Sequence, residues 1–177
     1  MAQQEVIFAG FGGQGILSMG KFLAYAGMDT QMNVSWCPSY GPEMRGGTAN
    51  CSVILSDQEI GSPVITLPDS VIVMNRPSFD KFEPMLKPGG LLIMDSDLIP
   101  DESIRTDIKV IKIPAQTIAE GLSSKTIANM VLLGALVKET GIVEVEDLLK
   151  ALKDHGKEKF YKVNEQAVAR GIEYAKA

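Results

Sequence analysis

Two glycine-rich segments hold the residues whose types and spacing could do chemistry. The first reads Gly10-Phe11-Gly12-Gly13-Gln14-Gly15, and the second reads Ser39-Tyr40-Gly41-Pro42-Glu43-Met44-Arg45-Gly46-Gly47. Each follows an apolar run, which is how an α/β protein builds a ligand or partner site at the end of its sheet. The two segments are therefore the candidate functional edge of this chain.

The first segment satisfies the pattern G-x-G-x-x-G through Gly10, Gly12 and Gly15. Between a strand and a helix, free amide N–H groups and the helix dipole can hold an anionic group. Gly13 and Gln14 suit a tight loop whose backbone and side chain can meet a phosphate, a ribose or a neighbouring subunit. A glycine turn needed only for packing a helix on a sheet explains the same residues, so these uses stay open.

A dinucleotide site needs more than the glycines. A NAD site also uses an Asp or Glu at the end of the second strand for the ribose hydroxyls, whereas the expected second strand here ends at Ser35-Trp36-Cys37. The run Lys87-Pro88-Gly89-Gly90-Leu91 looks like a late strand of S-adenosylmethionine methyltransferases, which use a similar acid. A free-standing Rossmann-type enzyme that uses NAD or S-adenosylmethionine is therefore the alternative interpretation. This chain lacks the acidic residue after the second strand that such an enzyme uses.

The second segment is expected to be an ordered loop because Pro42 fixes its own φ angle. Arg45 suits bidentate recognition of a carboxylate or phosphate, and Gly46 and Gly47 let the backbone approach whatever it holds. Glu43 can pair with Arg45, so an internal ion pair that staples the turn is the alternative to a contact with a partner.

Other polar residues have local explanations. Asn129 lies early in an apolar helix and must find hydrogen-bond partners if it is buried, so we expect it to bind the backbone of a neighbouring loop. A Ser or Thr of the segment Ser123-Ser124-Lys125-Thr126 is expected to cap that helix. Asp95 and Asp97 are expected to serve a turn or helix cap and not a Mg²⁺ site, and His155 is expected to be solvated near a helix end. No residue is predicted to be catalytic or to bind a metal.

The composition narrows the function classes. The 177 residues are 45% hydrophobic, with a net charge of −5 and no basic stripe, so nucleic acid is not an expected partner. Cys37 and Cys51 are the only cysteines and cannot hold an iron–sulfur cluster of the usual kind. The N-terminus lacks a basic, apolar leader and the apolar run 127–137 is too short to span a bilayer, so we expect a cytoplasmic chain with no membrane contact.

The hydrophobic pattern predicts one α/β domain over residues 1–177. The expected strands are 5–9, 31–37, 48–55, 70–74, 91–94 and 110–113, with a brief strand or connector around 64–65 and a loop over 38–47. The expected helices are 16–27, 77–86, 116–121, 124 or 125 to 140, 144–155 and about 157–176. We therefore expect a three-layer α/β/α domain with a mostly parallel, Rossmann-like sheet and a helical C-terminal part.

The sequence resembles the gamma subunit, or gamma-type domain, of the 2-oxoacid:ferredoxin oxidoreductases over nearly its whole length. The resemblance rests on residues 10–15, on residues 40–47 with the following Thr48-Ala49-Asn50, and on residues 125–130 leading into Leu133-Gly134. It is most like the 2-oxoglutarate and branched-chain 2-oxoacid types.

The resemblance implies a subunit of a thiamine-dependent enzyme that converts a 2-oxoacid and coenzyme A into an acyl-CoA and passes electrons to ferredoxin. Thiamine diphosphate, Mg²⁺ and the iron–sulfur clusters would belong to the alpha, beta and, where present, delta subunits, so the isolated chain is expected to be inactive. It also implies that Tyr40, Glu43, Arg45, Gly46 and Gly47 face a partner subunit or coenzyme A. The glycine loop would contact coenzyme A or a neighbouring subunit.

Overall fold

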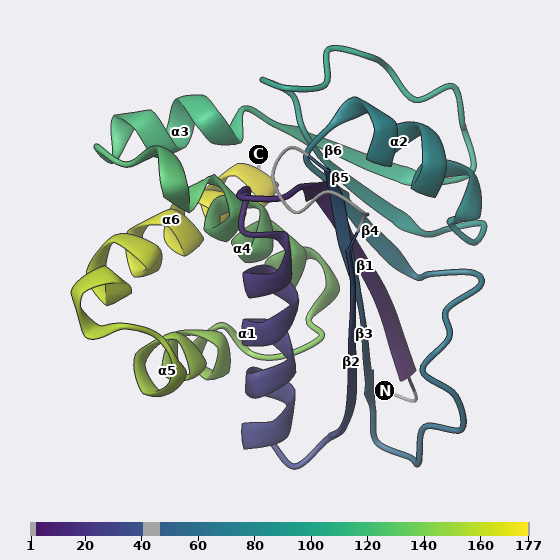
Figure 1. The fold of residues 1–177 in the computed structure, drawn as a ribbon, viewed down its shortest axis with the longest axis horizontal. Coiled ribbons are helices and arrows are strands. Elements are labelled where there is room, and N and C mark those ends of the chain that lie inside the picture. Colours follow the sequence, from purple (N-terminus) through teal and green to yellow (C-terminus); the bar gives the residue numbers. More distant parts are fainter. Residues whose placement is uncertain (1–2, 41–46, 177) are drawn as a thin grey trace.

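The computed structural model describes residues 3–40 and 47–176, which form one sheet with helices on both faces (Figure 1). Its strands are β1 (Gln3–Phe11), β2 (Asn33–Tyr40), β3 (Thr48–Ser56), β4 (Ser70–Val73), β5 (Leu91–Asp95) and β6 (Lys109–Ile113). Its helices are α1 (Ile16–Asp29), α2 (Arg76–Phe82), α3 (Ala115–Gly121), α4 (Ala128–Thr140), α5 (Val145–His155) and α6 (Glu158–Lys176), with short 3₁₀ turns η1 (Glu83–Met85) and η2 (Lys125–Ile127).

The sheet has six strands in the order β2-β3-β1-β4-β5-β6. Strands β4, β5 and β6 run parallel to β1, whereas β3 pairs antiparallel with both β1 and β2. The expected mostly parallel α/β sheet is confirmed. The antiparallel β3 lies between β1 and β2, so the first two strands are not neighbours as they are in a dinucleotide-binding sheet.

Alternating side chains of the central strands pack into two cores, one on each face of the sheet. Phe8 of β1 packs with α1 and α4 in the larger core, while its neighbour Ile7 packs with Phe79 and Phe82 of α2 on the other face. Figure 1 shows α1 and α2 on opposite sides of the sheet, with α5 and α6 outside α1 and α4. Strands β4 and β5 are buried along their whole length, which explains their continuous apolar sequence.

Helix α6 packs closely on α4. A Cβ at Gly171 would overlap the carbonyl oxygen of Val131, and a Cβ at Gly134 would overlap that of Val168. The two helices therefore approach backbone to backbone, which only glycine permits at these two positions.

The segment around residues 64–65 is a connector, which is one of the two alternatives expected for it. The expected loop over residues 38–47 begins too early, because Pro38 to Tyr40 extend β2 and Pro38 pairs with Cys51. Proline is tolerated there because β2 is an edge strand, where its missing N–H removes no bond to a second neighbour.

Candidate functional site

The glycine loop connects β1 to α1 at the carboxyl end of the parallel strands. Gly13 and Gly15 adopt φ angles of 93° and 76°, in the left-handed region that favours glycine. At Gly15 a side chain is also excluded by space, because its Cβ would overlap the amide of Asn129. Around Gly13 the space is open.

The side chain of Gln14 closes this loop from inside. Its Oε1 accepts a hydrogen bond of 2.7 Å from the N–H of Phe11, and its Nε2 donates one of 3.0 Å to the carbonyl oxygen of Met74. Gln14 therefore joins the ends of β1 and β4. Each polar atom of its side chain makes one hydrogen bond within the chain and has the capacity for a second, so Gln14 can close the loop and still contact a ligand.

Asn129 fixes the start of α4 against the same loop. Its Nδ2 donates a hydrogen bond of 3.1 Å to the carbonyl oxygen of Gly15, and its Oδ1 accepts one of 2.9 Å from the N–H of Met130. The side chain is buried. The expectation that Asn129 binds the backbone of a neighbouring loop is confirmed.

The end of the second glycine segment is hydrogen-bonded to the first segment. The N–H of Gly12 donates a hydrogen bond of 2.9 Å to the carbonyl oxygen of Gly47, and β1 then pairs with β3 from Phe11 and Thr48 onward. Tyr40 closes the other side by pairing its backbone with Ala49. Glu43, Arg45 and Gly46 lie outside the described residues.

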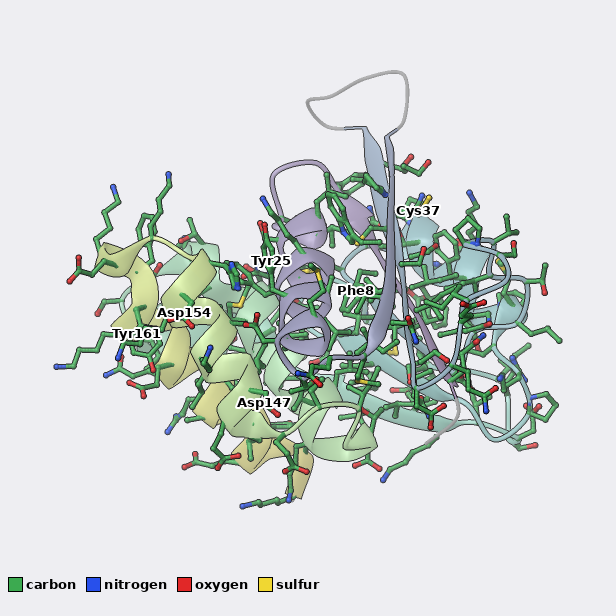
Figure 2. The ribbon with its side chains drawn as sticks, turned by 90° about the horizontal axis from the view of Figure 1, so that it is seen from below. Phe8, Tyr25, Cys37, Asp147, Asp154 and Tyr161 are labelled. Carbon is green, nitrogen blue, oxygen red and sulfur yellow. The ribbon has the colours of Figure 1, made fainter. Side chains whose placement is uncertain are left out.

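The two faces of the β2–β3 arm have different neighbours. In Figure 2, Cys37 lies on the side of the sheet opposite to Tyr25 of α1. Trp36 points the other way, because its Nε1 lies 3.2 Å from the position of a Cβ at Gly20 of α1. Cys51 also faces α1, and its burial raises the pKa of the thiol to about 12. A buried neutral thiol of this kind is unreactive.

A small hollow opens beside the glycine loop. It has a volume of about 270 Å³, and its walls include Gly13, Gln14, Met74, Gln116 and Lys125. Since α1 and α2 follow neighbouring strands β1 and β4 but cover opposite faces, the hollow lies at the crevice where open α/β sheets bind ligands. Among these walls, Gln116 of α3 had no recognisable signal in the sequence, whereas Lys125 of η2 lies in the segment 125–130 that carries the family resemblance.

The acidic pair after β5 builds a corner, as expected. The N–H of Asp97 donates to Asp95 at 3.1 Å, Gln116 donates to Asp95 at 2.8 Å, and the N–H of Thr117 donates to Asp97 at 2.7 Å. Burial raises the pKa of Asp95 above its ordinary value. Within residues 3–40 and 47–176, no three His, Cys, Asp or Glu side chains come together as a metal site.

His155 is the last residue of α5 and is exposed, so the expectation of a solvated residue near a helix end is confirmed. Its ring also stacks on Tyr25 at 3.9 Å between centroids, and its Nε2 lies 3.2 Å from a carboxylate oxygen of Asp29. The cause is the packing of the end of α5 on the end of α1. The expected cap before the apolar helix was wrong, because neither η2 nor α4 has a side-chain cap, and the hydroxyl of Ser124 instead shares a hydrogen bond with that of Thr126.

Comparison with known proteins identifies the family. Residues 5–174 match the family model described as pyruvate ferredoxin/flavodoxin oxidoreductase. The chain belongs to this family. It is 36% identical to the 2-oxoglutarate synthase subunit KorC of Methanocaldococcus jannaschii, in a match that covers 98% of this chain and 95% of KorC.

Other relatives are longer than this chain. The ketoisovalerate oxidoreductase subunit VorA of Methanothermobacter marburgensis is 37% identical over 97% of this chain, but the match spans only 36% of VorA.

Among solved structures, the keto/oxoacid ferredoxin oxidoreductase gamma subunit of Geobacter sulfurreducens has a TM-score of 0.89 at 31% identity. The match covers 99% of this chain and 97% of the Geobacter chain.

The 2-oxoglutarate:ferredoxin oxidoreductase of Magnetococcus marinus, solved with 2-oxoglutarate, coenzyme A and succinyl-CoA, also has a TM-score of 0.89, at 28% identity. That match covers 99% of this chain and 31% of the Magnetococcus chain. The fold of this family thus occurs both as a separate subunit and as part of a longer chain. No helix within the described residues is long and apolar enough to cross a membrane.

Proposed function

We propose that this chain is the gamma subunit of a 2-oxoacid:ferredoxin oxidoreductase and that 2-oxoglutarate is the substrate of the complex. The observation that carries the proposal is the end-to-end match with KorC, which covers 95% of that 2-oxoglutarate synthase subunit. The other relatives that also match along most of their length include further KorC subunits. The chain would act as one domain in the cytoplasm, where its two thiols stay reduced.

The reaction would take place mainly on partner subunits. Alpha, beta and, where present, delta chains would hold thiamine diphosphate, Mg²⁺ and the iron–sulfur clusters, decarboxylate the 2-oxoacid and pass two electrons to ferredoxin. Coenzyme A would then take the acyl group. The described residues of this chain fit a supporting role, since Cys51 is buried, Asp95 and Asp97 hold a corner, and His155 is paired with Asp29.

The two glycine segments would form the edge that meets the partner or coenzyme A. Support comes from the hydrogen bond between Gly12 and Gly47, because it sets Gly47, the end of the second segment, directly beside the loop that carries Gly10 to Gly15. Gly13 would leave its backbone open to a close approach, and Tyr40, Glu43, Arg45 and Gly46 would belong to the same edge.

Substitution of Arg45 tests this edge. Arg45→Ala should leave the melting temperature of the free chain nearly unchanged, since an exposed arginine contributes within about ±0.5 kcal/mol to stability. In the reconstituted complex it should weaken assembly on a sizing column or raise the coenzyme A concentration needed for dye reduction. Arg170→Ala, which removes an arginine more than half exposed on α6, is the matched control.

The outcomes separate function from structure. A complex that assembles and uses coenzyme A normally with Arg45→Ala would overturn the assignment of this edge. A melting temperature several degrees lower, with a normal complex, would show that Arg45 serves the fold. Failure of the wild-type chain to join alpha and beta subunits at all would contradict the proposed subunit role.

A further inference from the structure

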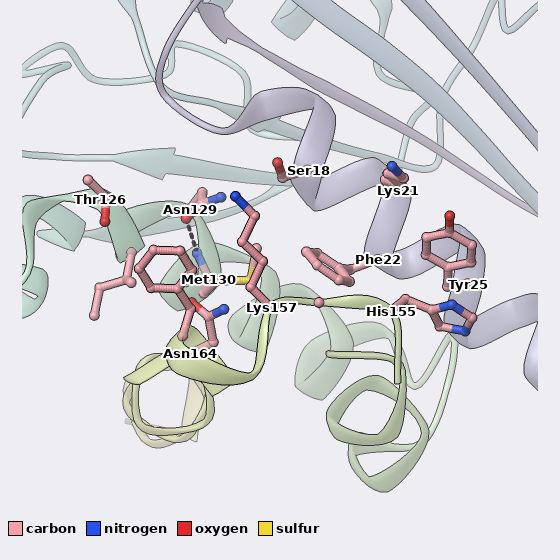
Figure 3. A pocket seen from close by; sticks show the side chains of 13 residues that line it. Ser18, Lys21, Phe22, Tyr25, Thr126, Asn129, Met130, His155, Lys157 and Asn164 are labelled. Carbon is pink, nitrogen blue, oxygen red and sulfur yellow. Dashed lines mark hydrogen bonds between the residues drawn. The ribbon is translucent and has the colours of Figure 1, made fainter. Parts of the chain in front are cut away.

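A second and larger cavity lies on the helical side of the molecule, between α1, the start of α4 and the joint of α5 with α6 (Figure 3). Its volume is about 440 Å³. Pockets for small organic ligands and cofactors commonly measure about 300–1,000 Å³, so the cavity is large enough for a nucleotide. It shares Thr126 with the hollow beside the glycine loop.

The charge of this cavity is positive in a chain whose net charge is −5. Lys21 of α1 and Lys157 of the joint before α6 line it, and no Asp or Glu is among the described residues of its walls. Neither lysine forms an ion pair within the described residues. In Figure 3 the Lys157 side chain extends toward α1. Lys21 Nζ lies 5.9 Å from the centroid of the Tyr25 ring, which is also part of the wall. Two ammonium groups without a carboxylate partner among the described residues suit a phosphate.

Aromatic rings provide an apolar surface beside the lysines. Phe22 of α1 and Phe160 of α6 both line the cavity, and Phe160 is 43% exposed although its ring is apolar. Gly156 lies beside the ring of Phe22, since a Cβ at Gly156 would lie 3.4 Å from its Cζ, in ordinary contact. An exposed ring in a cavity gains by stacking on a flat partner.

Asn164 supplies the remaining polar recognition. Its amide lines the cavity and is half-buried, yet it makes no hydrogen bond with any described residue. An amide offers a donor and an acceptor side by side, which match the N6 amino group and N7 of adenine. Figure 3 shows Asn164 on the wall opposite Ser18 of α1.

We propose that this cavity binds an adenosine phosphate, with its phosphates at Lys21 and Lys157, its base against the phenylalanine rings and the edge of its base at Asn164. The proposal is carried by two lysine ammonium groups, an exposed aromatic surface and an amide that makes no hydrogen bond with any described residue, all in one cavity. It is independent of the proposed function, because a chain that fails to assemble into an oxidoreductase could still bind the nucleotide, and the reverse also holds.

Calorimetry with ADP on the purified full chain tests the proposal. We expect a dissociation constant of about 10–100 µM. The double variant Lys21→Ala/Lys157→Ala should weaken ADP binding by about tenfold or more, whereas Lys138→Ala/Lys176→Ala removes the same charge outside the cavity and should change it less than about twofold. Asn164→Ala should weaken ADP but leave the affinity for pyrophosphate unchanged.

Coenzyme A also carries an adenosine phosphate, so measuring its binding distinguishes a free nucleotide from the nucleotide end of a larger cofactor. If coenzyme A binds more tightly than ADP and ADP competes with it, the ligand is the nucleotide end of a larger cofactor. If ADP binds and coenzyme A does not, it is a free nucleotide. The absence of heat with millimolar ADP, or equal weakening by the two double lysine variants, would overturn the proposal.

Discussion

Replacing Asn129 by alanine tests how the candidate site is held in place. The change removes the acceptor for the N–H of Met130, which lies in a buried part of the helix start, and this costs about 1–3 kcal/mol. It also removes the donor to Gly15, whose carbonyl oxygen keeps a second bond of 3.1 Å from the N–H of Met19, so only the net value of about 1 kcal/mol is lost there. We expect a total of about 2–4 kcal/mol.

Urea and thermal unfolding measure this loss. At about 2–4 °C per kcal/mol for a chain of this size, the melting temperature should fall by roughly 5–15 °C, with an unchanged urea m-value. Asn164→Ala in nucleotide-free protein is the matched control, because that amide has no hydrogen bonds to lose, and it should stay within about ±0.5 kcal/mol. Asn129→Asp keeps the shape of the side chain but loses the donor, so it should destabilise as well.

Two results would refute the reasoning. If Asn129→Ala and Asn164→Ala destabilise equally, the bonds to the glycine loop carry no particular weight. If Asn129→Asp matches the wild type while alanine does not, the loss comes from the acceptor for the N–H of Met130 or from the volume of the side chain, and the donor to Gly15 carries no weight.

Four further outcomes follow from close packing, burial and the loop bonds. Gly171→Ala should destabilise the chain by about 1–3 kcal/mol in urea unfolding, because its Cβ overlaps the backbone of Val131. Alkylation followed by mass spectrometry should label the exposed Cys37 and spare the buried Cys51 until urea is added. The pKa of Cys51 is raised from 9.0 to about 12, so its stabilising contribution is present below pH 9 and is lost as the pH rises toward 12; Cys51→Ala should flatten that alkaline fall. Gln14→Ala should lower the melting temperature by roughly 4–10 °C, since two hydrogen bonds between strand ends disappear, and no change would contradict the role of Gln14 in closing the loop.

The sequence predicts most of the elements because their hydrophobic periods are regular. The buried run of β5 and the helix that contains Asn129 are recognisable from composition alone. The order of the strands is not, since the placement of β3 between β1 and β2 is set by pairing across the sheet and not by any local pattern. The end of β2 was also misplaced, because a proline in an edge strand has the same local signature as one in a loop.

The site follows the same division. A tight loop at Gly13 and Gly15 is predicted because glycine tolerates positive φ angles, and a buried amide at Asn129 implies a backbone partner. The two lysines of the larger cavity were missed, since Lys21 and Lys157 come from distant parts of the chain and look like ordinary solvated lysines until the fold brings them together. The stacking of His155 on Tyr25 was missed for the same reason, because its partner comes from α1.

The most direct test of the subunit assignment is purification of the tagged full-length chain from its native cell, followed by mass spectrometry and an assay of the eluate. The assignment predicts stoichiometric partner chains and reduction of a viologen dye that requires both 2-oxoglutarate and coenzyme A, with no such activity from the chain alone. A chain that elutes without partners, or an eluate without any 2-oxoacid-dependent dye reduction, would contradict it.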